Sequence, residues 1–203
     1  MVQMFINGGA FMWPILILLV IGLMISIERM ITLSRASINS KKFIAKVKES
    51  LNAGGVEEAI KVCANTRGPI ASIFHAGLIR SKDGIENVEK AIANAGTIEM
   101  AFLERGLIWL ATVIALAPML GFTGTVQGMI NAFDAIKAAN DISPAIVAGG
   151  ISIALLTTLF GLIVAMIIQF FHNLFVSTID RLVIDMEESS TELVDSLVEL
   201  SRK

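Results

Sequence analysis

Hydroxyl and amide side chains are concentrated in two segments of this chain that carry no charge. Residues 106–133 and 142–179 contain no Asp, Glu, Lys or Arg. A hydroxyl in a helix can bond to the carbonyl one turn back, so one Thr alone indicates little. Polar groups in a bilayer are costly unless they are paired or hydrated, so many of them together predict a hydrated path or an interface with another polar helix. The residues concerned include Thr112, Thr123, Thr125, Gln127, Asn131, Ser152, Thr157, Thr158 and Gln169.

Small residues recur at helical spacing beside these hydroxyls. Small residues allow membrane helices to pack closely and to form hydrogen bonds between them. The pattern therefore fits a packing surface between helices or the lining of a pore, and the sequence leaves both open. One stripe is Gly121, Thr125, Gly128 and Ala132, and the other is Ala154, Thr158, Gly161 and Ala165.

These segments must be held by membrane helices, because each exceeds the ~20 residues that span a bilayer. A third charge-free stretch, residues 1–27, has its apolar part at 11–27. A cleaved signal peptide is disfavoured there, since no Lys or Arg precedes the apolar run and no small-residue cleavage site follows it. With 55% hydrophobic residues and a mean hydropathy of +0.75, the chain is expected to be an all-α membrane protein with three transmembrane helices and a cytoplasmic helical domain.

Basic residues set the expected orientation. None precedes the first apolar run, and six follow it between Arg29 and Lys48, which predicts an external N-terminus and a cytoplasmic C-terminus. The expected layout is a periplasmic N-terminus (1–10), a first span (11–33), a cytoplasmic helical domain (34–105), a second span (106–134), a periplasmic loop (135–143), a third span (144–176) and a cytoplasmic C-terminal helix (177–203). The external connection is a loop of eight residues from Asp134 to Asp141.

Turn-forming residues divide the cytoplasmic part into short helices. A helix capped by Asn39–Ser40 is expected to end at Gly54–Gly55, and the next is expected to end at Arg67-Gly68-Pro69. Asp83–Gly84 turns the chain again. From Ile85 no breaker precedes Pro118, so one helix is expected to run from the cytoplasm into the membrane. No β pattern occurs.

The C-terminal tail continues the third span with a heptad seam. Because a lone helix cannot bury such a seam, the pattern predicts oligomerisation. Acidic residues cover the other faces, as a solvated surface or as an acidic vestibule that concentrates cations. The seam consists of Ile179, Val183, Met186, Ser190, Leu193, Leu197 and Leu200.

Other chemistry finds no support in the sequence. The net charge of −2 gives no nucleic-acid footprint, and no P-loop, metal-ligand cluster or catalytic set is present. We therefore expect no enzyme activity, cofactor or metal. The single Cys63 allows no disulfide within the chain. His172 is the one titratable group in the two long segments, and it is expected at the membrane interface beside Asn173.

The order of the membrane residues resembles a known family. Residues 115–129, A-L-A-P-M-L-G-F-T-G-T-V-Q-G-M, resemble the second-span signature A-P-x-x-G-x-x-G-T-V-x-G of the MotA/TolQ/ExbB proton channel family. Residues 149–162, G-G-I-S-I-A-L-L-T-T-L-F-G-L, are similar to its third-span segment G-I-x-E-A-L-x-x-T-x-x-G-L. Residues 55–60 match a cytoplasmic G-D-x-E-x-A stretch more weakly. Three spans look like ExbB or TolQ, and the four-span MotA stators differ.

The resemblance implies a subunit of an ion-driven motor in the bacterial inner membrane. It implies a pentamer around a dimer of a single-span ExbD-like or TolR-like partner, in contact with membrane lipids, with work passed to a TonB-like or TolA-like protein. The expected ion pathway consists of Thr125, Thr158, Thr157, Gly121, Gly128, Ala154 and Gly161.

One departure from the family pattern concerns charge. Ile153 stands where the family's third-span motif has a glutamate. A proton-carrying carboxylate would then have to come from the partner helix, and Na⁺ coordinated by hydroxyls and carbonyls stays open. So does a non-conducting scaffold that stabilises its partner. A secondary transporter ranks third, because no internal repeat or intramembrane charge is found.

Overall fold

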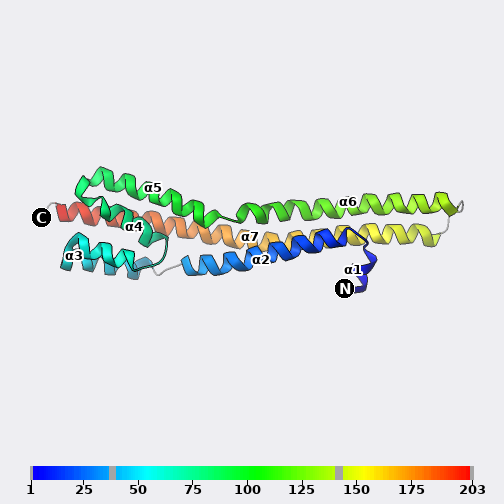
Figure 1. Cartoon of the computed structure of the whole chain (residues 1–203), viewed down its shortest axis with the longest axis horizontal. Coiled ribbons are helices and arrows are strands. Elements are labelled where there is room, and N and C mark those ends of the chain that lie inside the picture. Colours follow the sequence, from blue (N-terminus) through cyan, green and yellow to red (C-terminus); the bar gives the residue numbers. More distant parts are fainter. Residues whose placement is uncertain (1, 37–39, 140–143, 202–203) are drawn as a thin grey trace. The chain divides into compact units, whose positions relative to one another are not determined.

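The computed structural model describes residues 2–36, 40–139 and 144–201, which are helical almost throughout and contain no strand (Figure 1). The expected all-α fold is confirmed. The elements are α1 (Val2–Asn7), α2 (Met12–Ala36), α3 (Ser40–Ala64), α4 (Pro69–Ile79), the 3₁₀ helix η1 (Ser81–Asp83), α5 (Ile85–Glu104), α6 (Leu107–Ala139) and α7 (Pro144–Ser201).

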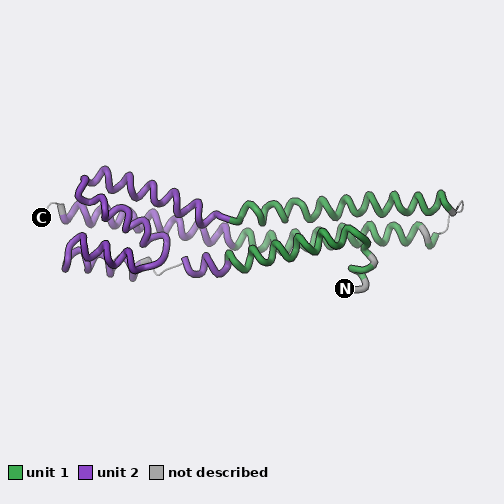
Figure 2. The backbone as a smooth tube through the Cα atoms, in the orientation of Figure 1, with its two compact units in different colours: residues 1–29, 106–174 green, residues 30–105, 175–203 purple. Residues whose placement is uncertain are grey.

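The chain forms two compact units (Figure 2). Unit 1 contains residues 1–29 and 106–174, and unit 2 contains residues 30–105 and 175–203. Each unit is thus assembled from segments that are distant in sequence, because α2 and α7 each continue from one unit into the other.

Three helical stretches are long and apolar enough to cross a membrane: Met12–Ala64, Ile85–Ala138 and Val147–Leu200. In the first, the charged α3 follows the apolar α2, so the apolar part belongs to α2. Large apolar side chains of unit 1 are exposed, including Trp13 (62%), Ile108 (73%) and Phe122 (67%). Such a surface requires lipid or a partner, so the expectation of three spans is confirmed.

Helix α6 extends further than expected at its C-terminal end. Asp134 to Ala139 are helical, so the predicted loop from Asp134 to Asp141 is wrong in this part. The sequence D-A-I-K-A-A is rich in good helix formers, and polarity alone does not end a helix. Asp141 lies outside the described residues. Pro118 lies inside α6 and does not end it.

The helix expected to run unbroken from Ile85 toward Pro118 is interrupted at Gly106. α5 ends at Glu104, and the N–H of Arg105 donates to the carbonyl of Phe102 at 3.3 Å. Gly106 then has φ +90°, a conformation that a residue with a Cβ rarely adopts. The prediction of one continuous helix is therefore wrong.

Three other glycines make the predicted turns of unit 2. Gly55 interrupts α3 with φ 72° and ψ −167°, Gly68 precedes Pro69 at the start of α4, and Gly84 precedes α5 with φ 97°. These three breaks are confirmed. The predicted cap at Asn39 lies outside the described residues.

α4 is the centre of unit 2, where it packs against α3 and α5. Ile70, Ile73, Phe74 and Leu78 are buried, and the rings of Phe43 and Phe74 lie 5.6 Å apart. An 11-residue helix is marginal by itself, so burial of this apolar face stabilises it.

The C-terminal part of α7 is buried by its own chain. α7 is continuous from Pro144 to Ser201, which confirms that the tail continues the third span. Met186, Leu193 and Leu197 are at most 5% exposed within the monomer, and Lys48 of α3 pairs with Glu192 at 3.0 Å. Burial of Ile179, Met186, Leu193 and Leu197 thus requires no other subunit, which corrects the premise that the seam cannot be buried within one chain. Val183, Ser190 and Leu200 stay partly exposed.

Gly55 provides a test of backbone strain in unit 2. Its φ and ψ lie in a region that is essentially restricted to glycine, while a Cβ there would meet nothing within 4 Å. Gly55→Ala should lower the free energy of unfolding by about 1–3 kcal/mol. The matched control Gly96→Ala, inside α5 with ordinary contact to Ile73, should be neutral or stabilising by up to about 1 kcal/mol. Denaturant unfolding of both variants gives the comparison, and equal effects would contradict it.

Cys63, on the charged helix α3, provides a test of the unit 2 interior. Burial raises the pKa of its thiol from 9.0 to about 11. At pH 8 the thiolate fraction should fall about 100-fold, and alkylation should slow accordingly relative to the unfolded chain. Because the folded state favours the neutral thiol, this contribution to stability is present below pH 9 and is lost as pH rises toward 11. Equal alkylation rates in folded and unfolded protein would contradict the prediction.

Candidate functional site

The backbones of α6 and α7 approach closely in unit 1 because both helices present small residues. A Cβ atom built on Gly161 would lie 2.5 Å from the carbonyl oxygen of Ala117, and one on Gly121 would lie 3.0 Å from Cα of Thr158. A Cβ on Gly128 would lie 3.1 Å from the backbone nitrogen of Ala154. The small-residue stripes are thus a packing surface between two helices of one chain.

Thr125 and Thr158 face each other across this contact. Their Oγ1 atoms are hydrogen-bonded to each other. The Thr125 hydroxyl also lies 3.2 Å from the carbonyl oxygen of Gly121 on its own helix and 3.3 Å from that of Ala154 on α7. The Thr158 hydroxyl lies 3.1 Å from Gly121 O and 3.4 Å from Ala154 O. Two hydroxyls therefore share two carbonyls, one from each helix.

Thr157 occupies a different environment from its neighbour. It is 1% exposed, and its hydroxyl donates to Ala154 O at 2.9 Å. A Cβ on Gly124 would lie 2.6 Å from Thr157 Oγ1, so Thr157 fills the space that this glycine leaves. Its side chain lies inside the hairpin.

The threonine pair can reverse the direction of its hydrogen bonds. Each hydroxyl has one proton and two lone pairs, whereas each has three acceptors within reach. Either hydroxyl can therefore donate to the other or to a carbonyl. Both residues are half-buried, so an oxygen outside the hairpin could exchange a hydrogen bond with them.

Within the charge-free segments 106–133 and 142–179, His172 is the one titratable side chain that the structure describes. Ile153, half-buried on α7, precedes Ala154. His172 lies on α7 with its Nδ1 buried and without a hydrogen-bond partner, and Asn173 accepts a bond from Gln169 at 2.7 Å. Across residues 2–36, 40–139 and 144–201, no group of three or more His, Cys, Asp or Glu could hold a metal.

Two backbone carbonyls complete the cluster, and the pattern of side chains alone did not predict them. Each threonine follows by four positions a small residue whose carbonyl it shares, Gly121 before Thr125 and Ala154 before Thr158. This matched spacing is a signal that could have indicated the pairing. Gly124, which accommodates Thr157, lies outside the predicted stripe of Gly121, Thr125, Gly128 and Ala132.

Comparison with known proteins assigns the whole hairpin to one family of sequences. The model for the MotA/TolQ/ExbB proton channel family matches residues 65–188. A putative biopolymer transport protein ExbB homolog of Methanothermobacter thermautotrophicus is 33% identical over 179 residues, covering 88% of this chain and 63% of the relative. Putative biopolymer transport protein ExbB-like 1 of Synechocystis sp. is 32% identical over 168 residues, covering 79% and 65%. The biopolymer transport protein ExbB of Xanthomonas campestris is 39% identical over 99 residues, covering 49% and 39%. The chain thus spans less than two thirds of each of these relatives.

The close approach of α6 and α7 can be tested at Gly161. Gly161→Ala places a methyl group against backbone atoms that cannot rotate away, so the variant should lose about 1–3 kcal/mol of stability. The matched control Gly149→Ala on the same helix has open space around its Cβ and should retain wild-type stability or gain slightly. Thermal unfolding in detergent measures both, and a Gly161→Ala protein as stable as the control would show that the helices do not approach this closely.

Proposed function

Because the chain belongs to the MotA/TolQ/ExbB proton channel family, we propose that it is an ExbB/TolQ-like subunit of an ion-driven complex in the inner (cytoplasmic) membrane. The observation that carries the assignment of the site is the hydrogen-bonded pair Thr125–Thr158. These hydroxyls connect the two charge-free helices at a place still partly open to another helix.

The proposal requires a partner that contributes the titrating group. Hydroxyls can pass a proton along but do not hold an excess proton near neutral pH, and residues 106–133 and 142–179 contain no carboxylate. The acid would lie on a single-span ExbD-like or TolR-like partner, present as a dimer inside a homopentamer of this chain. Transfer of each charge across 100 mV supplies roughly 2.3 kcal/mol for the movement.

Thr125 and Thr158 would act as the contact for that acid. A protonated carboxyl of the partner would donate to one threonine oxygen, and after loss of the proton the carboxylate would accept a bond from the same hydroxyl. The carbonyls of Gly121 and Ala154 are alternative acceptors within 3.4 Å, so both states keep every hydroxyl proton bonded. The energy would reach a TonB-like or TolA-like protein, with the N-terminus periplasmic and the C-terminus cytoplasmic.

A non-conducting scaffold is the second candidate. It is favoured by the same geometry, because both hydroxyl protons already have acceptors within the chain. In that case, the threonines only join α6 to α7, and the partner needs the pentamer for stability alone. The two candidates differ in whether the hydroxyls matter after assembly is complete.

Replacement of both hydroxyls separates these candidates. Thr125→Val and Thr158→Val keep side-chain volume but remove the bonds to a partner acid. With the partner co-purified in liposomes, ion flux driven by a pH gradient should fall at least about tenfold, the effect of losing one hydrogen bond of ~1.4 kcal/mol in the limiting step. A sodium gradient in parallel identifies the ion.

Thr112→Val is the control, because the Thr112 hydroxyl bonds within α6 to Ile108 O at 2.8 Å. It should leave flux unchanged. Co-purification of the partner shows that assembly is intact in each variant. Full ion flux from assembled Thr158→Val complexes would refute the role of the pair. A wild-type complex that assembles with its partner but shows no ion flux would favour the scaffold.

A further inference from the structure

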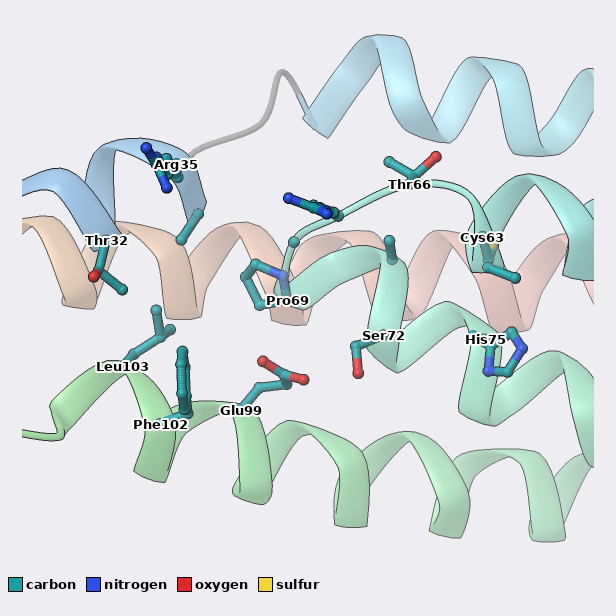
Figure 3. Close-up of a pocket in the computed structure, with 15 residues that line it drawn as sticks. Thr32, Arg35, Cys63, Thr66, Pro69, Ser72, His75, Glu99, Phe102 and Leu103 are labelled. Atoms are coloured by element: carbon teal, nitrogen blue, oxygen red, sulfur yellow. The ribbon is translucent and has the colours of Figure 1, made fainter.

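Unit 2 contains a cavity of about 660 Å³ that the proposed ion pathway does not use. It lies between the end of α2, the turn from α3 to α4, and the facing sides of α4 and α5 (Figure 3). Thr32 and Arg35 come from α2, and Glu99, Phe102 and Leu103 come from α5. Four segments thus border one cavity, which is open to the outside, with Arg35 and Arg67 exposed at its edge.

Charges of both signs face this cavity without pairing. Arg35, Arg67 and Glu99 line it, and none of the three forms an ion pair with any described residue. Figure 3 shows Arg35 and Glu99 on opposite sides of the space. Opposite charges held apart around a cavity fit a ligand that itself carries both charges.

The hydroxyl and imidazole groups of the lining add capacity for hydrogen bonds. Ser72 and His75 project from α4 into the same space (Figure 3). Thr66 is already used, because its hydroxyl donates to Val62 O at 2.8 Å. A phosphate between the arginines would therefore have further donors nearby.

The sequence places the lining residues of α2 and α5 next to the apolar segments. On α2 the charge-free run ends at Ile27, and Thr32 and Arg35 follow on the same helix. On α5, Phe102 and Leu103 lie four and three residues before Gly106, where the charge-free stretch begins. Phe102 is 50% exposed. Residues at this level of a membrane helix meet the headgroups and glycerol of lipids.

We propose that this cavity binds the headgroup of a membrane phospholipid that carries both a phosphate and a primary ammonium. Arg35 and Arg67 bind the phosphate, and guanidinium groups match its geometry. Glu99 accepts hydrogen bonds from the ammonium. Phe102 lies against the apolar part of the lipid. Charges of both signs favour this headgroup over a purely anionic one, and a choline headgroup lacks N–H donors for Glu99.

The site is tested by native mass spectrometry of the full chain in detergent, with phosphatidylethanolamine, phosphatidylglycerol and phosphatidylcholine of identical acyl chains in equal amounts. Phosphatidylethanolamine should be retained in preference to both others. Arg35→Gln with Arg67→Gln should weaken its retention at least about tenfold, as expected for lost charge-assisted hydrogen bonds. Glu99→Gln should remove the preference over phosphatidylcholine while phosphate binding persists.

Matched controls change the same charges elsewhere in unit 2. Arg80, which pairs with Asp83 at 3.2 Å, and Glu86, which pairs with Lys90 at 2.7 Å, do not line the cavity. Arg80→Gln and Glu86→Gln should bind as the wild type does. Equal retention of the three lipids, or equal losses in the control variants, would overturn the proposal.

Soluble phosphoethanolamine distinguishes a lipid from a free metabolite of the same chemistry. It should displace the lipid only weakly, because it lacks the apolar part that contacts Phe102. Displacement at concentrations similar to those of the lipid would overturn the assignment to a membrane lipid. The binding measurement needs neither the partner nor ion flux, so its outcome is independent of the proposed function.

Discussion

The close contact between α6 and α7 is the constraint on which the membrane part of this protein depends. In lipid, helices gain nothing from burying apolar surface against each other, so packing and hydrogen bonds must hold them together. Glycines 121, 128 and 161 bring the backbones near enough for hydroxyls on one helix to reach carbonyls on the other. With a larger residue at Gly121 or Gly161, Thr125 and Thr158 would lose their shared acceptors. The glycines are therefore the cause both of the close helix packing and of the hydrogen bonds between the helices.

The two long segments that form this contact carry no charged residue, and this limits the chemistry that the contact can perform. A buried carboxylate in a bilayer must be paired or hydrated, and Ile153 at the motif's acidic position removes that requirement from this chain. The site is therefore neutral: the carbonyls of Gly121 and Ala154 are fixed acceptors, and the hydroxyls of Thr125 and Thr158 can each donate or accept. Such a site can stabilise an acid presented by another helix in either protonation state, although it cannot store a proton itself. The proposed division of labour, in which the partner supplies the acid and this chain supplies the hydroxyls, follows from this composition.

Much of the fold could be predicted from the sequence because its signals are local. Charge-free length indicated the three spans, and Gly55, Gly68 and Gly84 indicated the breaks in unit 2. Gly106 was missed because a lone glycine looks the same in the sequence whether it is helical, as Gly96 is, or has a positive φ. The seam of α7 was recognised by its spacing, but sequence spacing does not show which surface covers it. In the structure, α3 and other parts of unit 2 cover the seam, and Glu192 of α7 pairs with Lys48 of α3.

The candidate site was predicted in composition but not in arrangement. The sequence indicated Thr125, Thr157 and Thr158 as one group, and all three hydroxyls do lie within hydrogen-bond distance of Ala154 O. Their exposure differs, because a helix turns by 100° per residue and adjacent threonines do not share a face. Thr157 turns toward Gly124 and is sealed, and Thr158 turns toward Thr125 and stays half-open. In the proposed function, the Thr125–Thr158 pair is the one that a partner can reach without disrupting the hairpin. The glycines support the pair indirectly, since a Cβ built on Gly121, Gly128 or Gly161 would lie 2.5–3.1 Å from backbone atoms of the opposite helix. A chain that functions through this site must therefore keep the glycines to hold the threonines in place, and any loss of function at a glycine would arise through displacement of the hydroxyl pair.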